Sequence, residues 1–138
     1  MTVEEQIEAF LAGSPHAVAG ASQDREKYGN KVLRAYIQRG RAVHPVNPRA
    51  DTVEGLTAYS DLAGLPEAVH GVSIVTPPRV TERIVAQAVQ LGIRHLWMQP
   101  GSESDTAIEQ ARQAGLNVLC GGPCILVALR FREEAAES

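Results

Sequence analysis

The chain has 138 residues, of which 44% are hydrophobic and 21% are charged, and its formal net charge at pH 7 is −3. This length and composition predict one globular domain with a hydrophobic core of its own. A negative chain has no general attraction for nucleic acid or for an anionic membrane, so we expect neither partner, and any bound anion must be held by local donors.

The first residues, MTVEEQIEAFLAG, predict a short leading helix within residues 1–14, because apolar residues recur on one face before a glycine and a proline. This segment is acidic and lacks the basic-then-apolar order of a signal peptide. No apolar run approaches the roughly 18–20 residues that cross a bilayer. We therefore expect a cytoplasmic location.

Strand and helix patterns alternate along the rest of the chain. Short apolar runs that stop at Gly, Pro or Asn-Pro predict strands, and apolar residues at helical spacing predict helices. In chain order the expected elements are a strand at 16–20, a helix at 29–40, a strand at 41–48, a brief strand and short helix at 55–66, a strand at 71–78, a helix at 79–92, a strand at 93–101, a helix at 102–115, a strand at 116–120 and a helix from 124 that ends in a charged tail at 132–138.

Two local details follow from the same patterns. Val32, Leu33, Tyr36 and Ile37 are expected to share the buried face of the helix at 29–40. Ser60 is expected to cap the short helix that precedes Pro66.

Alternation of strands with amphipathic helices predicts an α/β fold in one domain that covers residues 1–138. The expected architecture is a Rossmann-like, doubly wound and mostly parallel sheet of five or six strands with helices on both faces. Ligands of such sheets bind outside the carboxyl ends of the strands, at the switch point. Five segments rich in Gly, Pro and small polar residues fall there, although turns use the same residues: Gly20-Ala21-Ser22, Asn47-Pro48-Arg49, Thr76-Pro77-Pro78, Gln99-Pro100-Gly101 and Gly121-Gly122-Pro123.

The first of these segments has the features of a phosphate-binding turn. Gly20 permits a sharp turn, and Ala21 and Ser22 are small enough for an anion to approach backbone N–H groups. Gly29 opens the next helix, where a Cβ would crowd a bound phosphate or the neighbouring strand. Lys27 adds a positive charge beside the anion, or is simply a solvated surface lysine.

The turn departs from the dinucleotide fingerprint G-x-G-x-x-G, because Ser22 stands at its second glycine. A site for NAD also needs an acidic residue at the end of the second strand to hold the ribose hydroxyls. That position reads Asn47-Pro48-Arg49, and Asp51 lies further into the loop. An arginine there suits a ribose phosphate, which favours NADP or coenzyme A over NAD.

Five segments taken together resemble the coenzyme A-binding domain family: GASQDREKYGNKVL, VHPVNPR, VSIVTPP, WMQPG and GPC. This family includes stand-alone bacterial proteins and the N-terminal domains of succinyl-CoA synthetase α subunits and of NDP-forming acyl-CoA synthetases. The similarity runs from about residue 16 to residue 131. Trp97 and Gln99 are more similar to the stand-alone branch, whereas VTPP and GGPC are more similar to the synthetases.

The resemblance implies a site that extends over the loops at the strand ends. It places the pyrophosphate along Gly20, Ala21, Ser22 and Lys27, and the adenosine with its 3′-phosphate near Asn47, Pro48 and Arg49. It implies an apolar wall for adenine or the start of pantetheine at Thr76, Pro77 and Pro78. The pantetheine arm would lie beside Gln99, Pro100 and Gly101.

Candidates for catalysis are few. The four histidines are scattered in the sequence, and those within strands, His44 and His95, are expected to be partly buried and hydrogen-bonded. We expect no metal site, because CGGPC has no partnering histidine cluster. Cys124, at the start of a predicted helix, is either an inert small hydrophobe or a thiol that forms a mixed disulfide with CoA.

The prediction is therefore a non-catalytic domain that binds coenzyme A or an acyl-CoA. An NADP-dependent oxidoreductase or redox sensor is the first alternative, although no Tyr-x-x-x-Lys motif is present. A protein-interaction module on the same fold is the second. A homodimer is compatible with a Rossmann-like domain of this size.

Overall fold

The computed structural model describes residues 1–133. Its central sheet has five parallel strands, which confirms the predicted fold class. In spatial order they are β2 (Val43–Val46), β1 (His16–Ala19), β5 (Gly71–Ile74), β6 (His95–Met98) and β7 (Asn117–Leu119).

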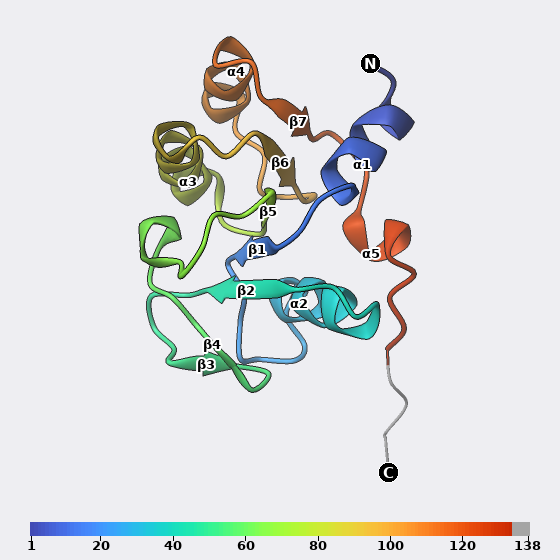
Figure 1. The fold of residues 1–138 in the computed structure, drawn as a ribbon, viewed down its shortest axis with the longest axis vertical. Helices are drawn as coiled ribbons and strands as arrows, with labels where there is room; N and C mark the ends of the chain where they lie inside the picture. Colours follow the sequence, from blue (N-terminus) through green and yellow to red (C-terminus); the bar gives the residue numbers. More distant parts are fainter. Residues whose placement is uncertain (134–138) are drawn as a thin grey trace.

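Helices cover both faces of this sheet, as predicted (Figure 1). One face carries α1 (Val3–Leu11), α2 (Tyr28–Gln38) and the single turn α5 (Ile125–Ala128). The other carries α3 (Pro78–Leu91), α4 (Asp105–Gln113) and the short 3-10 helix η1 (Leu62–Gly64). A two-stranded hairpin, β3 (Thr52–Val53) with β4 (Leu56–Thr57), stands apart from the sheet.

The alternation of side chains along each strand divides the core into two layers. In β1, Ala17 and Ala19 belong to the layer under α3 and α4, whereas Val18 belongs to the layer under α1 and α2. In β6, Met98 and Trp97 divide in the same way. All five side chains are fully buried, so both faces of the sheet are shielded from solvent, as expected for parallel strands.

Several local expectations are wrong. Ile37 is 41% exposed, because it lies at the edge of the apolar stripe of α2. The side chain that caps η1 is Asp61 and not Ser60, since Asp61 Oδ1 accepts from the Gly64 N–H at 2.9 Å. The β3 strand was not expected, because two residues are too few to show a strand pattern.

The final helix is much shorter than predicted. Arg130 adopts a left-handed φ of +53°, and the Phe131 N–H turns back to the Leu126 carbonyl at 2.8 Å, so α5 ends after one turn. Of the charged tail at 132–138, only Arg132 and Glu133 are described. Arg132 N–H contacts Gln38 of α2, and residues 134–138 lie outside the described range.

The connections place a switch point between two central strands. After β1 the chain passes through α2 to β2 on one side, and it then returns to β5 on the other side of β1. The loops after β1 and β5 therefore diverge and leave a crevice at the carboxyl edge of the sheet. None of the helices within residues 1–133 has the length and apolar character that crossing a membrane requires.

Candidate functional site

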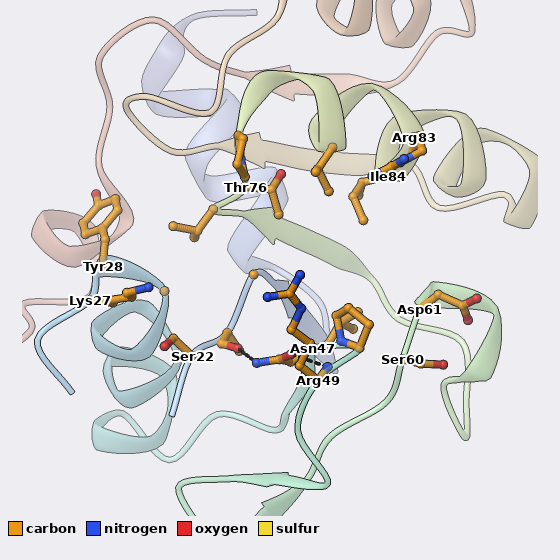
Figure 2. Close-up of a pocket in the computed structure, with 18 of the residues that line it drawn as sticks. Ser22, Lys27, Tyr28, Asn47, Arg49, Ser60, Asp61, Thr76, Arg83 and Ile84 are labelled. Carbon is orange, nitrogen blue, oxygen red and sulfur yellow. Dashed lines mark hydrogen bonds between the residues drawn. The ribbon is translucent and has the colours of Figure 1, made fainter. Parts of the chain in front are cut away.

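A cavity of about 730 Å³ occupies this crevice, beyond the carboxyl ends of β1, β2 and β5 (Figure 2). Its volume lies within the roughly 300–1,000 Å³ typical of small-molecule sites. The residues predicted from sequence that line it are Gly20, Ala21, Ser22, Lys27, Gly29, Asn47, Pro48, Arg49, Thr76 and Pro77. Four other predicted residues, Pro78, Gln99, Pro100 and Gly101, do not line it.

Two glycines let the loop between β1 and α2 pack tightly against its neighbours. Gly20 has φ +94°, and a Cβ on it would stand 2.0 Å from the Val75 carbonyl oxygen. A Cβ on Gly29 would stand 2.0 Å from the Gly20 carbonyl oxygen. The first turn of α2 therefore sits directly on the loop, and Gly29 is needed for this contact between protein segments.

The rest of the loop consists of turns that its own side chains stabilise. Ser22 Oγ accepts from the Asp24 N–H at 3.0 Å, and Asp24 Oδ1 accepts from the Glu26 N–H at 2.9 Å. Lys27 is the N-cap residue of α2, and its side chain makes no capping hydrogen bond. The start of an eleven-residue helix thus borders the cavity, and its partial positive charge favours an anion there.

The loop after β2 is joined to the first loop by one asparagine. Asn47 Nδ2 donates to the Ala21 carbonyl at 2.8 Å, and Asn47 Oδ1 accepts from the Arg49 N–H at 2.7 Å. Figure 2 shows both bonds and shows the exposed Arg49 side chain reaching from this loop into the cavity. The Asn47 amide therefore holds the loop in place, whereas the guanidinium of Arg49 is available to a ligand.

The opposite wall comes from α3 and was not predicted as part of the site. Val80, Arg83, Ile84 and Gln87 line it at helical spacing. The pattern of α3 alone could assign Val80 and Ile84 only to an apolar face, not to the cavity. Pro77 is the N-cap residue of α3 and lines the cavity, whereas Pro78 already belongs to the helix.

The cavity has a net positive lining in a protein whose formal net charge is −3. Its cationic residues are Lys27, Arg49 and Arg83, and Asp61 is its acidic residue. Like-charged side chains from three separate segments around one cavity suit an anionic ligand, because protein walls of low dielectric focus their field.

The loops after β6 and β7 form a second cluster, next to the cavity. Gln99 is fully buried, and its Oε1 accepts from the Ile125 N–H at 3.0 Å. Trp97 Nε1 donates to the Pro123 carbonyl at 2.9 Å. Trp97 and Gln99, which the sequence singled out together, therefore hold the segment before α5 and the first residue of α5.

Tyr28 connects this cluster to the cavity, which its side chain helps to line. Its hydroxyl contacts both Gln99 Oε1 and Cys124 Sγ. Burial, with a smaller contribution from Cys124, raises the pKa of Tyr28 well above its usual value, so the hydroxyl stays neutral and can donate. The mixed disulfide of Cys124 with CoA stays a prediction.

None of the four histidines lines the cavity. His44 and His95 are partly buried and hydrogen-bonded as predicted; His44 bonds Glu67 at 2.6 Å. His16, His70 and His95 are not scattered but lie in ring contact at the amino ends of the strands, with ring centroids 5.7 and 4.3 Å apart. Long-range pairing of strands brings these three rings together, and their sequence separation gives no sign of it.

Solved structures share this fold. A conserved hypothetical protein from Pyrococcus furiosus is 37% identical, with a TM-score of 0.79 and alignment over 84% of this chain and 99% of that one. The dinucleotide-forming acetyl-coenzyme A synthetase 1 of Candidatus Korarchaeum cryptofilum is 27% identical, with a TM-score of 0.73, over 83% of this chain and 27% of that one.

A curated relative is similar over much of the chain. The α subunit of acetate–CoA ligase (ADP-forming) II from Pyrococcus furiosus is 29% identical over 98 residues, which are 70% of this chain and 21% of the ligase subunit. The alignment thus spans about a fifth of the length of that relative. The model of the CoA binding domain family matches residues 15–130, which confirms the resemblance seen in the sequence. The chain belongs to the CoA-binding domain family.

Proposed function

We propose that this domain binds coenzyme A or an acyl-CoA in the cavity beyond β1, β2 and β5, and that it catalyses no reaction of its own. Membership of the family supports the choice of ligand. The cavity supports the location, because it combines small residues, a helix start and three cations in one place.

Each part of the ligand has a matching part of the lining. The diphosphate lies against the backbone of Ala21 and Ser22 and the first turn of α2, with Lys27 beside it. The 3′-phosphate is taken by Arg49. Val80 and Ile84 offer an apolar face to the adenine, and the pantetheine arm leaves past Tyr28 toward the loop at Gln99, Pro100 and Gly101.

The residues that follow β2 favour coenzyme A over NAD as the ligand. Asn47, Pro48 and Arg49 line the cavity there, and Asp51 does not. A carboxylate would hold ribose hydroxyls, whereas a guanidinium holds a phosphate on the ribose. A charge-assisted contact of this kind contributes about 1.5–3 kcal/mol, which corresponds to a change of about 10- to 150-fold in Kd.

Titration calorimetry with CoA, dephospho-CoA, NADPH and NADH tests this proposal. We expect the wild type to bind CoA most tightly of the four ligands. We expect Arg49→Ala to raise the Kd for CoA by at least about tenfold and the Kd for dephospho-CoA far less. Arg94→Ala is the matched control, because Arg94 is exposed and lies outside the cavity. An equal loss for CoA and dephospho-CoA contradicts the role of Arg49.

The other ligands distinguish the alternatives. Preference for NADPH would support a redox protein, and failure to bind any of the four would support an interaction module. Lack of catalysis is tested separately with acetyl-CoA, whose hydrolysis or transfer releases a free thiol that a colorimetric reagent detects. Thiol release that depends on the protein would overturn the non-catalytic part of the proposal.

A further inference from the structure

Two side chains of α2 that do not line the cavity hold the backbone of the loop between β1 and α2. The carbonyl of Ser22 accepts from Asn30 Nδ2 at 2.8 Å, and the carbonyl of Arg25 accepts from Arg34 Nη2 at 3.0 Å. Neither Asn30 nor Arg34 lines the cavity, so neither can touch a ligand in it.

Asn30 is the centre of this support. It is fully buried in the first turn of α2. Besides Ser22, its Nδ2 donates to Glu54 Oε2 at 2.9 Å, and its Oδ1 accepts from Arg34 Nε at 2.7 Å. Both N–H groups and the oxygen of the amide are therefore used, which fixes the orientation of the side chain.

Arg34 extends the support to Phe131 and Glu133, which follow α5. Its side chain is 6% exposed, and its positive charge is paired with Glu133, whose Oε1 lies 3.3 Å from Arg34 Nη2. Its guanidinium carbon lies 5.2 Å from the centre of the Phe131 ring. A buried cation that is paired on several sides is a rigid anchor for the Arg25 carbonyl.

The β3–β4 hairpin supports the same loop from outside. Glu54 stands at the turn of the hairpin with φ +50°, and its carboxylate also pairs with Arg25 Nε at 3.4 Å. Gln23 Nε2 donates to the Thr52 carbonyl at 2.8 Å. The hairpin, which stands apart from the main sheet, thus makes two side-chain contacts with the loop.

These contacts determine the direction of backbone N–H groups. In a trans peptide, the C=O of one residue and the N–H of the next point in opposite directions. A donor that holds the Ser22 carbonyl toward α2 therefore fixes the plane of the Ser22–Gln23 peptide, and with it the backbone of Ser22, which lines the cavity. A loop already fixed in this way loses little conformational freedom when it binds an anion, which raises affinity.

We propose that Asn30 is a positioning residue for the diphosphate of coenzyme A, with Glu54 of the hairpin as its outer support. This inference rests on the proposed function, since it concerns the affinity of the same site. Asn30 acts through the Ser22 carbonyl and makes no contact with the ligand.

The test compares Asn30→Ala, Glu54→Ala and Ser73→Ala for their Kd values and their resistance to urea. Ser73→Ala is the matched control, because Ser73 is also fully buried and hydrogen-bonded, to Tyr36 at 2.7 Å, but lies within the sheet. We expect Asn30→Ala to raise the Kd for CoA by about tenfold or more and Glu54→Ala by about threefold. Adenosine 3′-monophosphate, which lacks the diphosphate, should bind all variants within about twofold of the wild type.

A second measurement keeps the inference testable if Asn30→Ala does not fold. Glu54 lies in the turn of the outer hairpin and belongs to neither layer of the core, so Glu54→Ala is expected to stay folded, with faster hydrogen exchange of the amides at 22–26. Unchanged CoA affinity in every folded variant, or an equal loss in Ser73→Ala, would overturn the inference. A wild type that does not bind CoA would instead refute the proposed function.

Discussion

Substitution of Gly29 by alanine tests how closely the first turn of α2 must approach the ligand loop. In a helix interior, alanine is favoured over glycine by about 1 kcal/mol. Here, however, the new Cβ would stand 2.0 Å from the Gly20 carbonyl oxygen and 3.0 Å from its carbon, whereas ordinary contact begins at 3.4 Å. Both partners are backbone, so the loop itself must move by about 1.4 Å to restore ordinary contact. Overpacking of this kind costs about 1–3 kcal/mol, which equals or exceeds the gain in helix propensity.

We therefore expect Gly29→Ala to lower the free energy of unfolding in urea by up to about 2 kcal/mol. We also expect it to weaken CoA binding by about tenfold, because the displaced loop presents its N–H groups wrongly. Gly64→Ala is the control, because its Cβ would have no neighbour closer than 3.5 Å; we expect its stability to change by less than about 0.5 kcal/mol. A Gly29→Ala protein that matches or exceeds the wild type in stability, with unchanged CoA affinity, would refute the reasoning.

Three further predictions follow. Burial lowers the pKa of His16 to about 4 from the 6.5 of an exposed histidine, so the unfolded chain binds more protons than the folded one between pH 4 and pH 6.5. The free energy of unfolding should therefore fall by up to about 3 kcal/mol as the pH drops from 6.5 to 4. His16→Gln should reduce this dependence on pH in urea titrations. Asn47→Ala removes the bonds to Ala21 and Arg49, so CoA should bind about tenfold more weakly in calorimetry. Thr2→Ala breaks the capping box of α1 and should cost about 1 kcal/mol in urea unfolding.

Each of these predictions has a result that contradicts it. Equal stability at pH 4 and pH 6.5, or a His16→Gln variant with an unchanged pH slope, would show that this imidazole is not kept neutral by folding. Wild-type affinity in Asn47→Ala would mean that the two loops hold their positions without this link. A Thr2→Ala variant as stable as the wild type would show that α1 does not depend on its cap.

The elements that the sequence predicts well are those whose pattern is local. Each strand is a short apolar run closed by a turn residue, and α3 and α4 carry clear helical periodicity. The ends of five strands then identify the segments that meet at one edge, because parallel strands place their carboxyl ends together. Gly20, Asn47 and Thr76 were found in this way, and all three line the cavity.

The features that the sequence did not predict depend on contacts between distant segments. Arg83 and Gln87 look like the polar side of a surface helix until the packing of α3 turns them toward the crevice. Glu54 supports the loop only because a hairpin with almost no strand signal folds against it. Gln99, at a predicted strand end, is buried by the segment that leads into α5, and nothing in the local pattern shows that its side chain is used inside the protein.

A crystal structure of the protein with coenzyme A tests the central claim most directly. We expect the diphosphate to lie against the backbone N–H groups of Ala21 and Ser22 and the first turn of α2, with the guanidinium of Arg49 within hydrogen-bond distance of the 3′-phosphate. A turn left empty by the ligand, or filled by side chains of the protein, would contradict it.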